Sequence, residues 1–259
     1  MTFLEDTQKR MPLVSIIMPF FDAKETISDS VDSVLAQTEQ DFELILVDDC
    51  SRDDGYQIVT DKYAGEGRIK IFRLAVNSGA GVARNFGIEK ASGRFVAFLD
   101  ADDLWYPNKL TVQLSIMLEC EIPFICSAYD VIDNNGVSSG FRSPPGELSY
   151  HDLLHENKIG CLTVVYDTEY FGKRYMPTLR KRQDYALWLS LLRDCENCVC
   201  VQQVLAAYRL RPGSVSSNKL EMLKGNYDVF RHEEAMPWFR ALYWVGRNVL
   251  GKLRQQFVQ

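Results

Sequence analysis

The first hundred residues alternate between short apolar runs and longer amphipathic segments, and this alternation restricts the fold more than any other feature. The strand-like runs occupy residues 13–18, 42–47, 69–74 and 94–99. The segments with apolar residues at helical spacing occupy residues 23–37, 56–63 and 79–90. This pattern predicts an α/β fold with a Rossmann-like, mainly parallel sheet and helices on both faces. We expect Pro19 to end the first strand.

Length and composition limit the class of protein. A chain of 259 residues buries one sizeable core, so we predict one α/β domain at residues 1–218 and a C-terminal helical tail at residues 219–259. Apolar residues make up 46% and charged residues 25%, as in soluble globular proteins. The net charge of −6 argues against a nucleic-acid partner.

The sequence also indicates a compartment. Residues 1–10 lack the apolar run of a signal peptide, and no segment has the length and apolarity of a membrane span. Seven cysteines, an odd number, indicate reduced thiols, so we expect a cytoplasmic protein. Cys195, Cys198 and Cys200 cluster, but a structural zinc site needs a second pair of ligands at comparable spacing. We interpret these cysteines as small apolar residues in or beside a strand.

Two acidic clusters follow strand-like runs. Residues 48–54 contain four aspartates after the second run, and residues 100–103 contain three after the fourth run. A single acidic turn is an ordinary helix cap, but two at one sheet edge concentrate negative charge that needs compensation. Asp-x-Asp at a strand end supplies the oxygen ligands that Mg²⁺ or Mn²⁺ prefer, and such a cation binds diphosphates.

Other ways of binding a phosphate are absent from the sequence. Residues 19–22 read PFFD where a dinucleotide fold would have a glycine-rich turn. The Gly-x-x-x-x-Gly-Lys-Ser/Thr pattern does not occur either. A cation held by carboxylates is therefore the remaining way to bind a diphosphate.

These residues resemble those of the bacterial family 2 glycosyltransferases, which have the GT-A fold. The resemblance covers roughly residues 13–218, and its motifs are specific as a set rather than singly. They are VSIIMPFFD at 14–22, QT at 37–38, VDDCSRD at 47–53, NSG at 77–79, ARNFG at 83–87, GRFVAFLDADD at 93–103, QDYALWL at 183–189, YR at 208–209 and SVS at 214–216.

The resemblance implies roles for the nucleotide-binding residues. Pro19 and Phe21 match the loop that packs on the nucleoside. Asp49 matches the carboxylate that accepts a hydrogen bond from the base, which suits the N3–H of uracil. Asp100 and Asp102 match the Asp-x-Asp that holds the ribose and a metal ion, Mn²⁺ or Mg²⁺.

The resemblance also implies a general base at Asp184 and a basic residue beside the nucleotide pocket at Arg84. From the residues alone, the N-cap of the helix that follows is the favoured role for Asp184, whereas Arg84 is equally a solvated helix charge. Gln183 replaces the first member of a common Glu-Asp pair, so Asp184 is the acid that remains. Asp22 and Cys50 stand where the family usually has Asn and Gly.

The chemistry so implied is inverting sugar transfer from a nucleotide-sugar, with a UDP-sugar expected, to a hydroxyl of a glycan or lipid-linked acceptor in surface-polysaccharide biosynthesis. Asp184 takes the acceptor proton while a cation neutralises the leaving diphosphate. A non-catalytic nucleotide-sugar-binding module and a nucleotidyltransferase are the alternatives. The latter would show a glycine-rich basic loop in place of residues 19–21.

Basic residues lie near the predicted base and after the last motif. Lys173, Arg174, Arg180, Lys181 and Arg182 precede Asp184. They either bind an anionic group or form a solvated loop. Arg209 and Arg211 precede the Ser-rich residues 214–217, and we expect Arg209 to contact the donor phosphates if this loop closes.

The tail from Met236 to Gln259 contains four basic residues and no acidic one. Arg240, Arg247 and Arg254 recur every seven residues and share a helix face. We expect an apolar face made of Trp238, Leu242, Val245, Val249 and Leu253. The tail either packs on the domain as an ordinary helix or lies on the anionic inner face of the cytoplasmic membrane.

Overall fold

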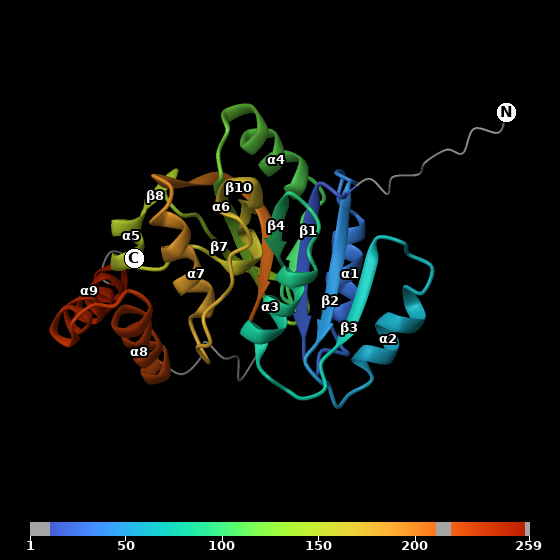
Figure 1. Ribbon diagram of the computed structural model, residues 1–259, viewed down its shortest axis with the longest axis horizontal. Coiled ribbons are helices and arrows are strands. Elements are labelled where there is room, and N and C mark those ends of the chain that lie inside the picture. The colour runs from blue at the N-terminus through green and yellow to red at the C-terminus, as the bar shows by residue number, and fades with distance from the viewer. Residues whose placement is uncertain (1–10, 211–218, 257–259) are drawn as a thin grey trace.

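The computed structural model describes residues 11–210 and 219–256. Its centre is a ten-stranded mixed sheet with the order β3-β2-β1-β4-β9-β6-β10-β5, with β7 paired to β6 and β8 paired to β10 (Figure 1). The strands are β1 Val14–Phe20, β2 Phe42–Asp48, β3 Ile69–Arg73, β4 Phe95–Phe98, β5 Leu104–Trp105, β6 Phe124–Ile132, β7 Ser138–Arg142, β8 Glu147–Ser149, β9 Val165–Asp167 and β10 Asn197–Arg209. The α-helices are α1 Ile27–Leu35, α2 Gly55–Lys62, α3 Ala80–Lys90, α4 Lys109–Cys120, α5 Tyr150–His155, α6 Thr168–Phe171, α7 Gln183–Leu192, α8 Lys219–Asp228 and α9 Trp238–Gln256. A 3₁₀ turn covers Cys161–Thr163 and a π-helical turn covers Val229–Glu233.

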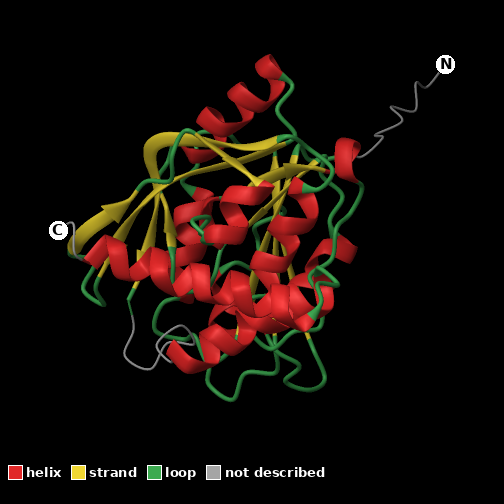
Figure 2. Cartoon of the chain, turned by 90° about the vertical axis from the view of Figure 1, so that its left-hand side faces the viewer, coloured by secondary structure: helices red, strands yellow, loops and turns green. Residues whose placement is uncertain are grey.

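The predicted α/β alternation is confirmed. Strands β3, β2, β1 and β4 are parallel neighbours, and β6 and β10 form a second parallel pair. β9 joins the two groups by pairing antiparallel with both β4 and β6. Figure 2 shows the strands flanked by helices, as the sequence predicts.

The expectation that Pro19 ends the first strand is wrong. β1 continues to Phe20, and Pro19 pairs with Val47 of β2. The ladder between β1 and β4 stops at Ile17, so Pro19 lies beyond it and has a neighbouring strand on one side only. A missing N–H is tolerated at such a position because no partner strand requires it.

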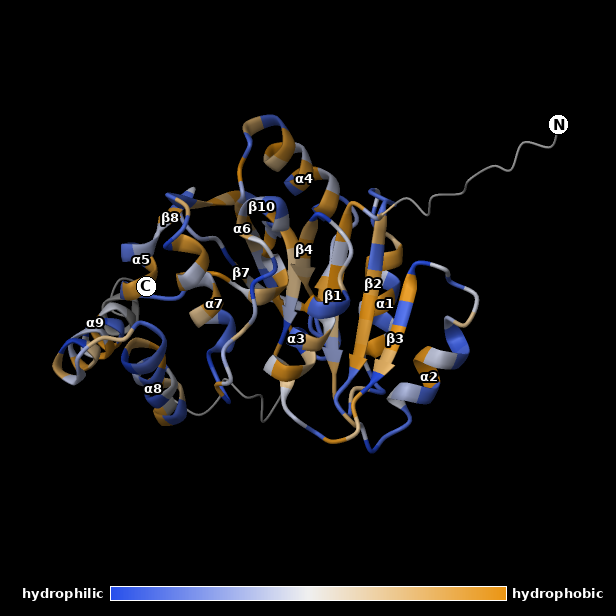
Figure 3. Cartoon of the chain, in the orientation of Figure 1, coloured by the Kyte–Doolittle hydropathy of each residue, from blue (hydrophilic) through white to orange (hydrophobic). Residues whose placement is uncertain are grey.

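Alternate side chains of the central strands fill two hydrophobic clusters, one on each face of the sheet. Ile16 and Met18 join the cluster that contains Val31 of α1, whereas Ile17 joins the cluster that contains Ala83 of α3. β2 is accordingly apolar along most of its length (Figure 3). Gly87 allows α3 to approach β1, because a Cβ atom there would lie 2.5 Å from Cγ2 of Ile17.

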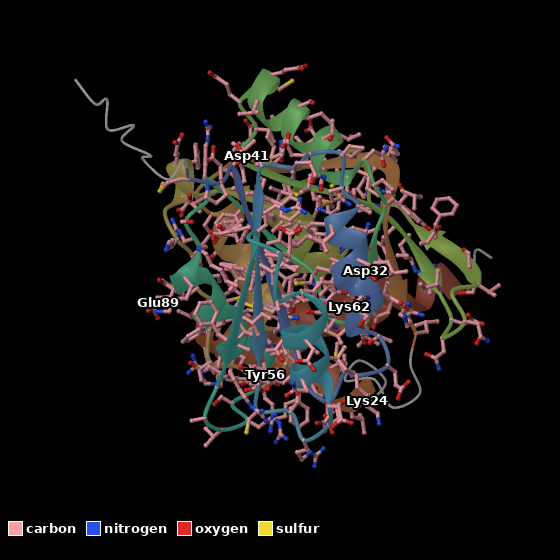
Figure 4. The ribbon with its side chains drawn as sticks, turned by 90° about the vertical axis from the view of Figure 1, so that its right-hand side faces the viewer. Lys24, Asp32, Asp41, Tyr56, Lys62 and Glu89 are labelled. Carbon is pink, nitrogen blue, oxygen red and sulfur yellow. The ribbon has the colours of Figure 1, made fainter. Side chains whose placement is uncertain are left out.

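Outside the sheet, α1 and α2 are joined by polar contacts. Lys62 Nζ lies 2.7 Å from Asp32 Oδ2 (Figure 4). Tyr63 donates a hydrogen bond to the other oxygen of Asp32. These groups are partly exposed, so their contribution to stability is small.

The predicted placement of the cysteines is confirmed. Cys198 and Cys200 lie in β10, Cys195 lies just before that strand, and Cys126 of β6 joins Cys198 and Cys200 in space. The three thiols at Cys126, Cys198 and Cys200 are buried and lie within 4.8 Å of one another. Cys126 and Cys200 meet because they are register partners across β6 and β10.

The C-terminal tail is helical, but its packed face is not the expected one. Ala241, Trp244 and Asn248 of α9 are buried, whereas Trp238 and Leu242 are exposed. Val245 and Val249 are half-buried, and the side chain of Leu253 lies outside the described part. The polar Asn248 faces inward because its amide donates to the carbonyls of Leu154 and His155, both at 2.7 Å.

α9 and the preceding turn share a hydrophobic cluster with α7 and β4. The division of the chain at residue 218 remains a prediction. In the described residues, every helix falls short of the length or apolarity needed to cross a bilayer.

Candidate active site

The carboxyl ends of β1, β2 and β4 lie next to one another because β1 pairs with both of the other strands. The loops that follow these strands therefore meet at one edge of the sheet. They carry the predicted residues Phe21, Asp49 and Asp100, so the topology assembles the site that the sequence suggested. This is the edge at which open parallel sheets bind ligands.

Asp49 is buried and anchors the beginning of α3. Its carboxylate accepts hydrogen bonds from the backbone amides of Ser78 and Gly79, both at 2.7 Å. Its own amide donates to the carbonyl of Phe20 at 2.8 Å. Gly79 has φ 92°, a conformation in which glycine avoids the strain of a side chain. A carboxylate has four lone-pair positions, so two remain on Asp49 for a further donor.

The loop after β1 is held to the loop after β2. The amide of Asp22 donates to Ser51 Oγ at 3.0 Å, and the amide of Arg52 donates to Asp22 Oδ1 at 2.7 Å. Pro19 is buried at the end of β1, whereas the ring of Phe21 is 40% exposed and lies 5.2 Å from the Arg52 guanidinium carbon. An exposed aromatic ring held beside a fixed loop suits stacking on a planar base.

The two departures from the family pattern in these loops share a backbone conformation. Asp22 has φ 48° and Cys50 has φ 65°, both left-handed. Asn and Gly adopt this region at lower cost than Asp and Cys, which explains the family's usual residues there. The chain keeps the same loop shape with less favourable side chains.

The acidic turn after β4 is compensated from two sides. Asp100 is 34% exposed and forms an ion pair through Oδ1 with the guanidinium of Arg84, whose side chain is 8% exposed. Asp103 is buried and accepts a hydrogen bond from the amide of Arg209 at 2.9 Å. Arg209 Nε in turn donates to the carbonyl of Asp102 at 2.9 Å. Asp102 itself is partly exposed.

Burial and neighbouring charges shift the pKa values of Asp103 and Arg84. Burial raises the pKa of the Asp103 carboxyl well above its usual value, and the charges of Asp102 and Asp100 add to the rise. Burial alone would lower the pKa of Arg84, but Asp100 and, more weakly, Asp184 outweigh it and raise that pKa. Arg84 is thus a buried cation near both acids, and the alternative of a solvated helix charge is wrong.

Asp184 lies in the first turn of α7, but it does not cap the helix. α7 begins at Gln183, and its N-cap residue is Arg182, with φ 66°. The carboxylate of Asp184 is partly exposed and forms no hydrogen bond or ion pair with the described residues. The capping role that the sequence left open for Asp184 is therefore not the one observed.

The loop that leads to Asp184 is fixed to α3. Asn85 Nδ2 donates to the carbonyl of Met176 at 2.8 Å, and the amide of Met176 donates to Asn85 Oδ1 at 2.7 Å. A groove of about 360 Å³ runs between the beginning of α3 and residues 177–183, with Asn77, Asn85 and Gln183 among its lining residues. Asp184 follows directly on this groove.

The basic residues before Asp184 do not act as one cluster. Lys173 Nζ donates to the carbonyl of Glu89 at 2.8 Å, Arg174 forms an ion pair with Asp194, and Lys181 forms an ion pair with Glu221. Arg182 lies near Asp184, which opposes the fall in the Arg182 pKa that burial causes. Arg211 and residues 214–217, expected to close over the donor, lie outside the described residues.

The residues of the Asp-x-Asp turn fit a hard divalent cation. Asp100 engages Arg84 through Oδ1, which leaves Oδ2 for another ligand. Burial raises the pKa of the Asp103 carboxyl, and the negative charges of Asp102 and Asp100 raise it further. Among the described residues, the group of three close metal-binding side chains is the buried thiols, not the carboxylates. A cation at Asp100 and Asp102 would therefore need further oxygen ligands from the substrate, as Mg²⁺ sites with one or two carboxylates do.

Sequence reasoning gave no role to three residues of this site. Asp103 was visible as the third acid after β4, but the sequence did not distinguish it from its partly exposed acidic neighbours, and the structure shows that it is buried. Asn85 lay in the quoted ARNFG motif, but its partner is 91 residues away. Cys161 lies near Arg84. Burial raises the pKa of the Cys161 thiol, and the positive charge of Arg84 partly opposes this rise. Nothing in the local sequence marks Cys161.

Comparison with known proteins agrees with this geometry. The family model described as Glycosyl transferase family 2 matches residues 15–175. The chain is similar to TuaG of Bacillus subtilis (strain 168), a protein named for teichuronic acid biosynthesis, with 42% identity over 90% of this chain and 92% of TuaG. It is also similar to WfgD of Escherichia coli, named UDP-Glc:alpha-D-GlcNAc-diphosphoundecaprenol beta-1,3-glucosyltransferase, with 40% identity over 95% of this chain and 96% of WfgD.

Among solved structures, the fold is similar to that of S. aureus TarS 1-349 in complex with UDP-GlcNAc. The TM-score is 0.72 at 20% identity, over 91% of this chain and 71% of that chain. At this identity the likeness concerns the fold alone, and it confirms the predicted arrangement of sheet and helices.

Proposed function

The chain belongs to glycosyl transferase family 2 and is a glycosyltransferase, and we propose that it moves a sugar with inversion from a UDP-sugar to a lipid-linked glycan. The observation that carries this proposal is the position of Asp184. Its carboxylate accepts no hydrogen bond from the described residues, and its charge, like that of Asp100, raises the pKa of the buried Arg84. In this arrangement Asp184 lies on the acceptor side of the transferred sugar, and the acidic turn lies on the side of the departing diphosphate.

The nucleotide occupies the loops after β1 and β2 in this proposal. Phe21 stacks on the base, Pro19 shapes the loop beneath it, and Asp49 accepts the N3–H of uracil through a remaining lone pair. The relative WfgD is named for UDP-Glc, and the TarS structure holds UDP-GlcNAc. Both names support uridine as the nucleoside.

The ribose and the diphosphate then lie at the acidic turn. Asp100 and Asp102 would hold Mn²⁺ or Mg²⁺, which would neutralise negative charge on the departing diphosphate. A similar fold with TM-score 0.65 and 13% identity, the mannosyltransferase PcManGT, was solved with GDP-Man and Mn²⁺. Arg84 forms an ion pair with Asp100, and Arg209 holds the backbone of the turn through the carbonyl of Asp102.

Asp184 acts as the general base. It takes the proton from the acceptor hydroxyl as the hydroxyl oxygen attacks the anomeric carbon, and the bond from that carbon to the diphosphate breaks on the opposite side. One displacement inverts the configuration, so an α-linked donor yields a β-glycoside. The beta-1,3 linkage in the name of WfgD agrees with this outcome.

The acceptor in this proposal is a glycan on a lipid diphosphate, used in the assembly of a surface polysaccharide. WfgD is named for such an acceptor and TuaG for teichuronic acid biosynthesis. Because such an acceptor is anchored in a membrane, the enzyme works at the surface of that membrane, and we place it on the cytoplasmic face.

Two variants test the assignment. Asp184→Asn should lower kcat by on the order of 10²-fold while the affinity for the UDP-sugar stays nearly unchanged. Asp102→Asn should abolish metal-dependent turnover, since an amide lacks the charge that the cation needs. Asp61→Asn, on the exposed side of α2, is the matched control and should behave as the wild type.

Donor consumption is measured for a panel of UDP-, GDP- and dTDP-sugars, with a lipid-linked acceptor present and absent. An unchanged kcat in Asp184→Asn refutes the base assignment. Nucleotide binding without any turnover of the wild type would favour a non-catalytic binding module, and release of inorganic pyrophosphate would favour a nucleotidyltransferase.

A further inference from the structure

The orientation of α9 on the rest of the molecule is fixed by polar contacts on one side of the helix. Asn248 is buried and donates to the carbonyls of Leu154 and His155 at the end of α5. Its Oδ1 accepts a hydrogen bond from Asn226 of α8 at 2.8 Å. The ring of Trp244 packs edge-on against His151 and His155. These contacts determine which side of α9 faces away from the protein.

That outward side is apolar. Its large side chains are 50% to 62% exposed and come from 13 consecutive residues. They are Trp238, Phe239, Leu242, Tyr243 and Leu250. Concentration of exposed aromatic and aliphatic side chains on one helix marks an interaction surface rather than ordinary scatter. α9 lies at the end of the molecule away from α2 and β3 (Figure 1), so the catalytic loops do not cover it.

A basic row borders this apolar band. Arg240 and Arg247 are exposed, and helical spacing places Arg240 one turn from Tyr243 and Arg247 one turn from both Tyr243 and Leu250. The same seven-residue spacing continues to Arg254 in the sequence, and residues 236–259 contain no acidic residue. Residues 1–235 therefore carry a net charge more negative than the −6 of the whole chain.

We propose that the outward face of α9, defined by Phe239, Leu242, Tyr243 and Leu250 with Arg240 and Arg247 at its edge, docks in the interface of an anionic bilayer. The apolar side chains lie at the boundary between headgroups and acyl chains, and the arginines contact lipid phosphates. This division of an apolar band and a basic edge is that of helices lying in the membrane plane.

Charge complementarity favours this occupant over the others. A second copy of the chain meeting the same face by two-fold symmetry would bring two basic rows together. A lipid surface instead supplies apolar and anionic groups in adjacent layers, as the helix requires. This inference rests on the proposed function in one respect: docking on the membrane would keep the active site near a lipid-linked acceptor.

Point variants on exposed positions test the surface without opening the core. Phe239→Ser combined with Leu250→Ser removes apolar area, and Arg240→Gln combined with Arg247→Gln removes charge. Leu118→Ser on α4, where the side chain is 46% exposed, is the matched apolar control. Truncation before α9 is a poorer test because it would uncover the buried Trp244 contacts.

Binding is measured by flotation with vesicles of phosphatidylglycerol and phosphatidylcholine in equal amounts, and with vesicles of phosphatidylcholine alone. The wild type and Leu118→Ser should bind the anionic vesicles, and added salt should weaken this binding. The double arginine variant should bind about thirtyfold more weakly, from the usual contribution of two basic residues. The double apolar variant should lose binding to a similar extent.

Absence of wild-type binding to anionic vesicles, or equal binding by all variants, overturns the proposal. So does a concentration-dependent dimer, seen by light scattering, that the double apolar variant abolishes, because the face would then be a protein contact. Hydrolysis of a UDP-sugar in vesicle-free buffer is measured for every variant. Its retention alongside lost flotation separates a failure of membrane docking from a failure of the proposed enzyme.

Discussion

Replacing Lys109 by methionine should change how the stability of this protein depends on pH. Lys109 is fully buried at the beginning of α4, with Nζ 4.1 Å from the centre of the Trp105 ring and 2.6 Å from Gln113 Oε1. No acidic side chain pairs with it among the described residues. Burial therefore lowers the pKa of Lys109 from the ordinary 10.5 to about 7.

The sign of the effect follows from proton binding. Between pH 7 and about 10 the unfolded chain keeps a proton on Lys109 that the folded chain has lost. The free energy of unfolding therefore rises with pH across this window, by about 1.4 kcal/mol per pH unit at most. From pH 7.5 to 9.5 the wild type should gain about 2–3 kcal/mol relative to Lys109→Met. Below pH 7 both states hold the proton and the difference stops changing.

Urea unfolding of the two proteins, under reducing conditions and at several pH values, measures this difference. Lys109→Met also removes the hydrogen bond to the Gln113 amide. Because this amide does not titrate, its lost partner shifts the free energy of unfolding of the variant by a constant amount and leaves the dependence on pH intact. Lys24→Met, at a half-exposed lysine, is the control and should run parallel to the wild type. A constant difference between the wild type and Lys109→Met from pH 7.5 to 9.5 would refute the lowered pKa.

Three further outcomes are expected. Cys50→Gly should stabilise the protein by up to about 1 kcal/mol, because glycine adopts the left-handed φ of 65° without strain, and a lower urea midpoint would contradict this. Calorimetry should show tighter binding of UDP than of GDP, because Asp49 has been assigned to the N3–H of uracil, and the reverse order would overturn that assignment. Gly79→Ala should lower stability by on the order of 1 kcal/mol and weaken UDP binding, since φ of 92° shapes the loop that Asp49 holds, and unaltered unfolding and binding curves would show that the loop tolerates a side chain.

The sequence predicts the first half of the fold well because local patterns determine it. The apolar runs of β1, β2 and β4 are buried on both sides, and such runs are typical of parallel strands between helices. β9 escapes this reasoning because it has three residues and pairs antiparallel with two strands that are distant in sequence. The prediction for Pro19 is wrong because a proline ends a strand only where partner strands need its N–H. How far the pairing of β1 with β4 extends is a tertiary property, which the local sequence does not contain.

The tail shows a related limit. Helical periodicity identifies α9, but it does not say which of two apolar stripes faces the protein. The buried stripe contains Asn248, which a pattern of apolar residues would assign to solvent, because two backbone carbonyls of α5 and α8's Asn226 satisfy it. The more apolar stripe is the exposed one, so hydrophobicity alone predicts the wrong face.

The acids of the active site differ in what the chain provides for them, and this difference separates their roles. Asp49 is held by two backbone amides, Asp100 by the buried Arg84, and Asp103 by the amide of Arg209. Asp184 accepts no hydrogen bond from the described residues although a helix begins beside it. A carboxylate whose oxygens were already occupied by fixed donors would be a poor base, because those donors stabilise its ionised form against taking a proton. In the proposed mechanism, the residue that accepts the proton is thus one whose oxygens the described chain leaves for the acceptor hydroxyl, while the residues that hold the loops are the ones the chain has paired.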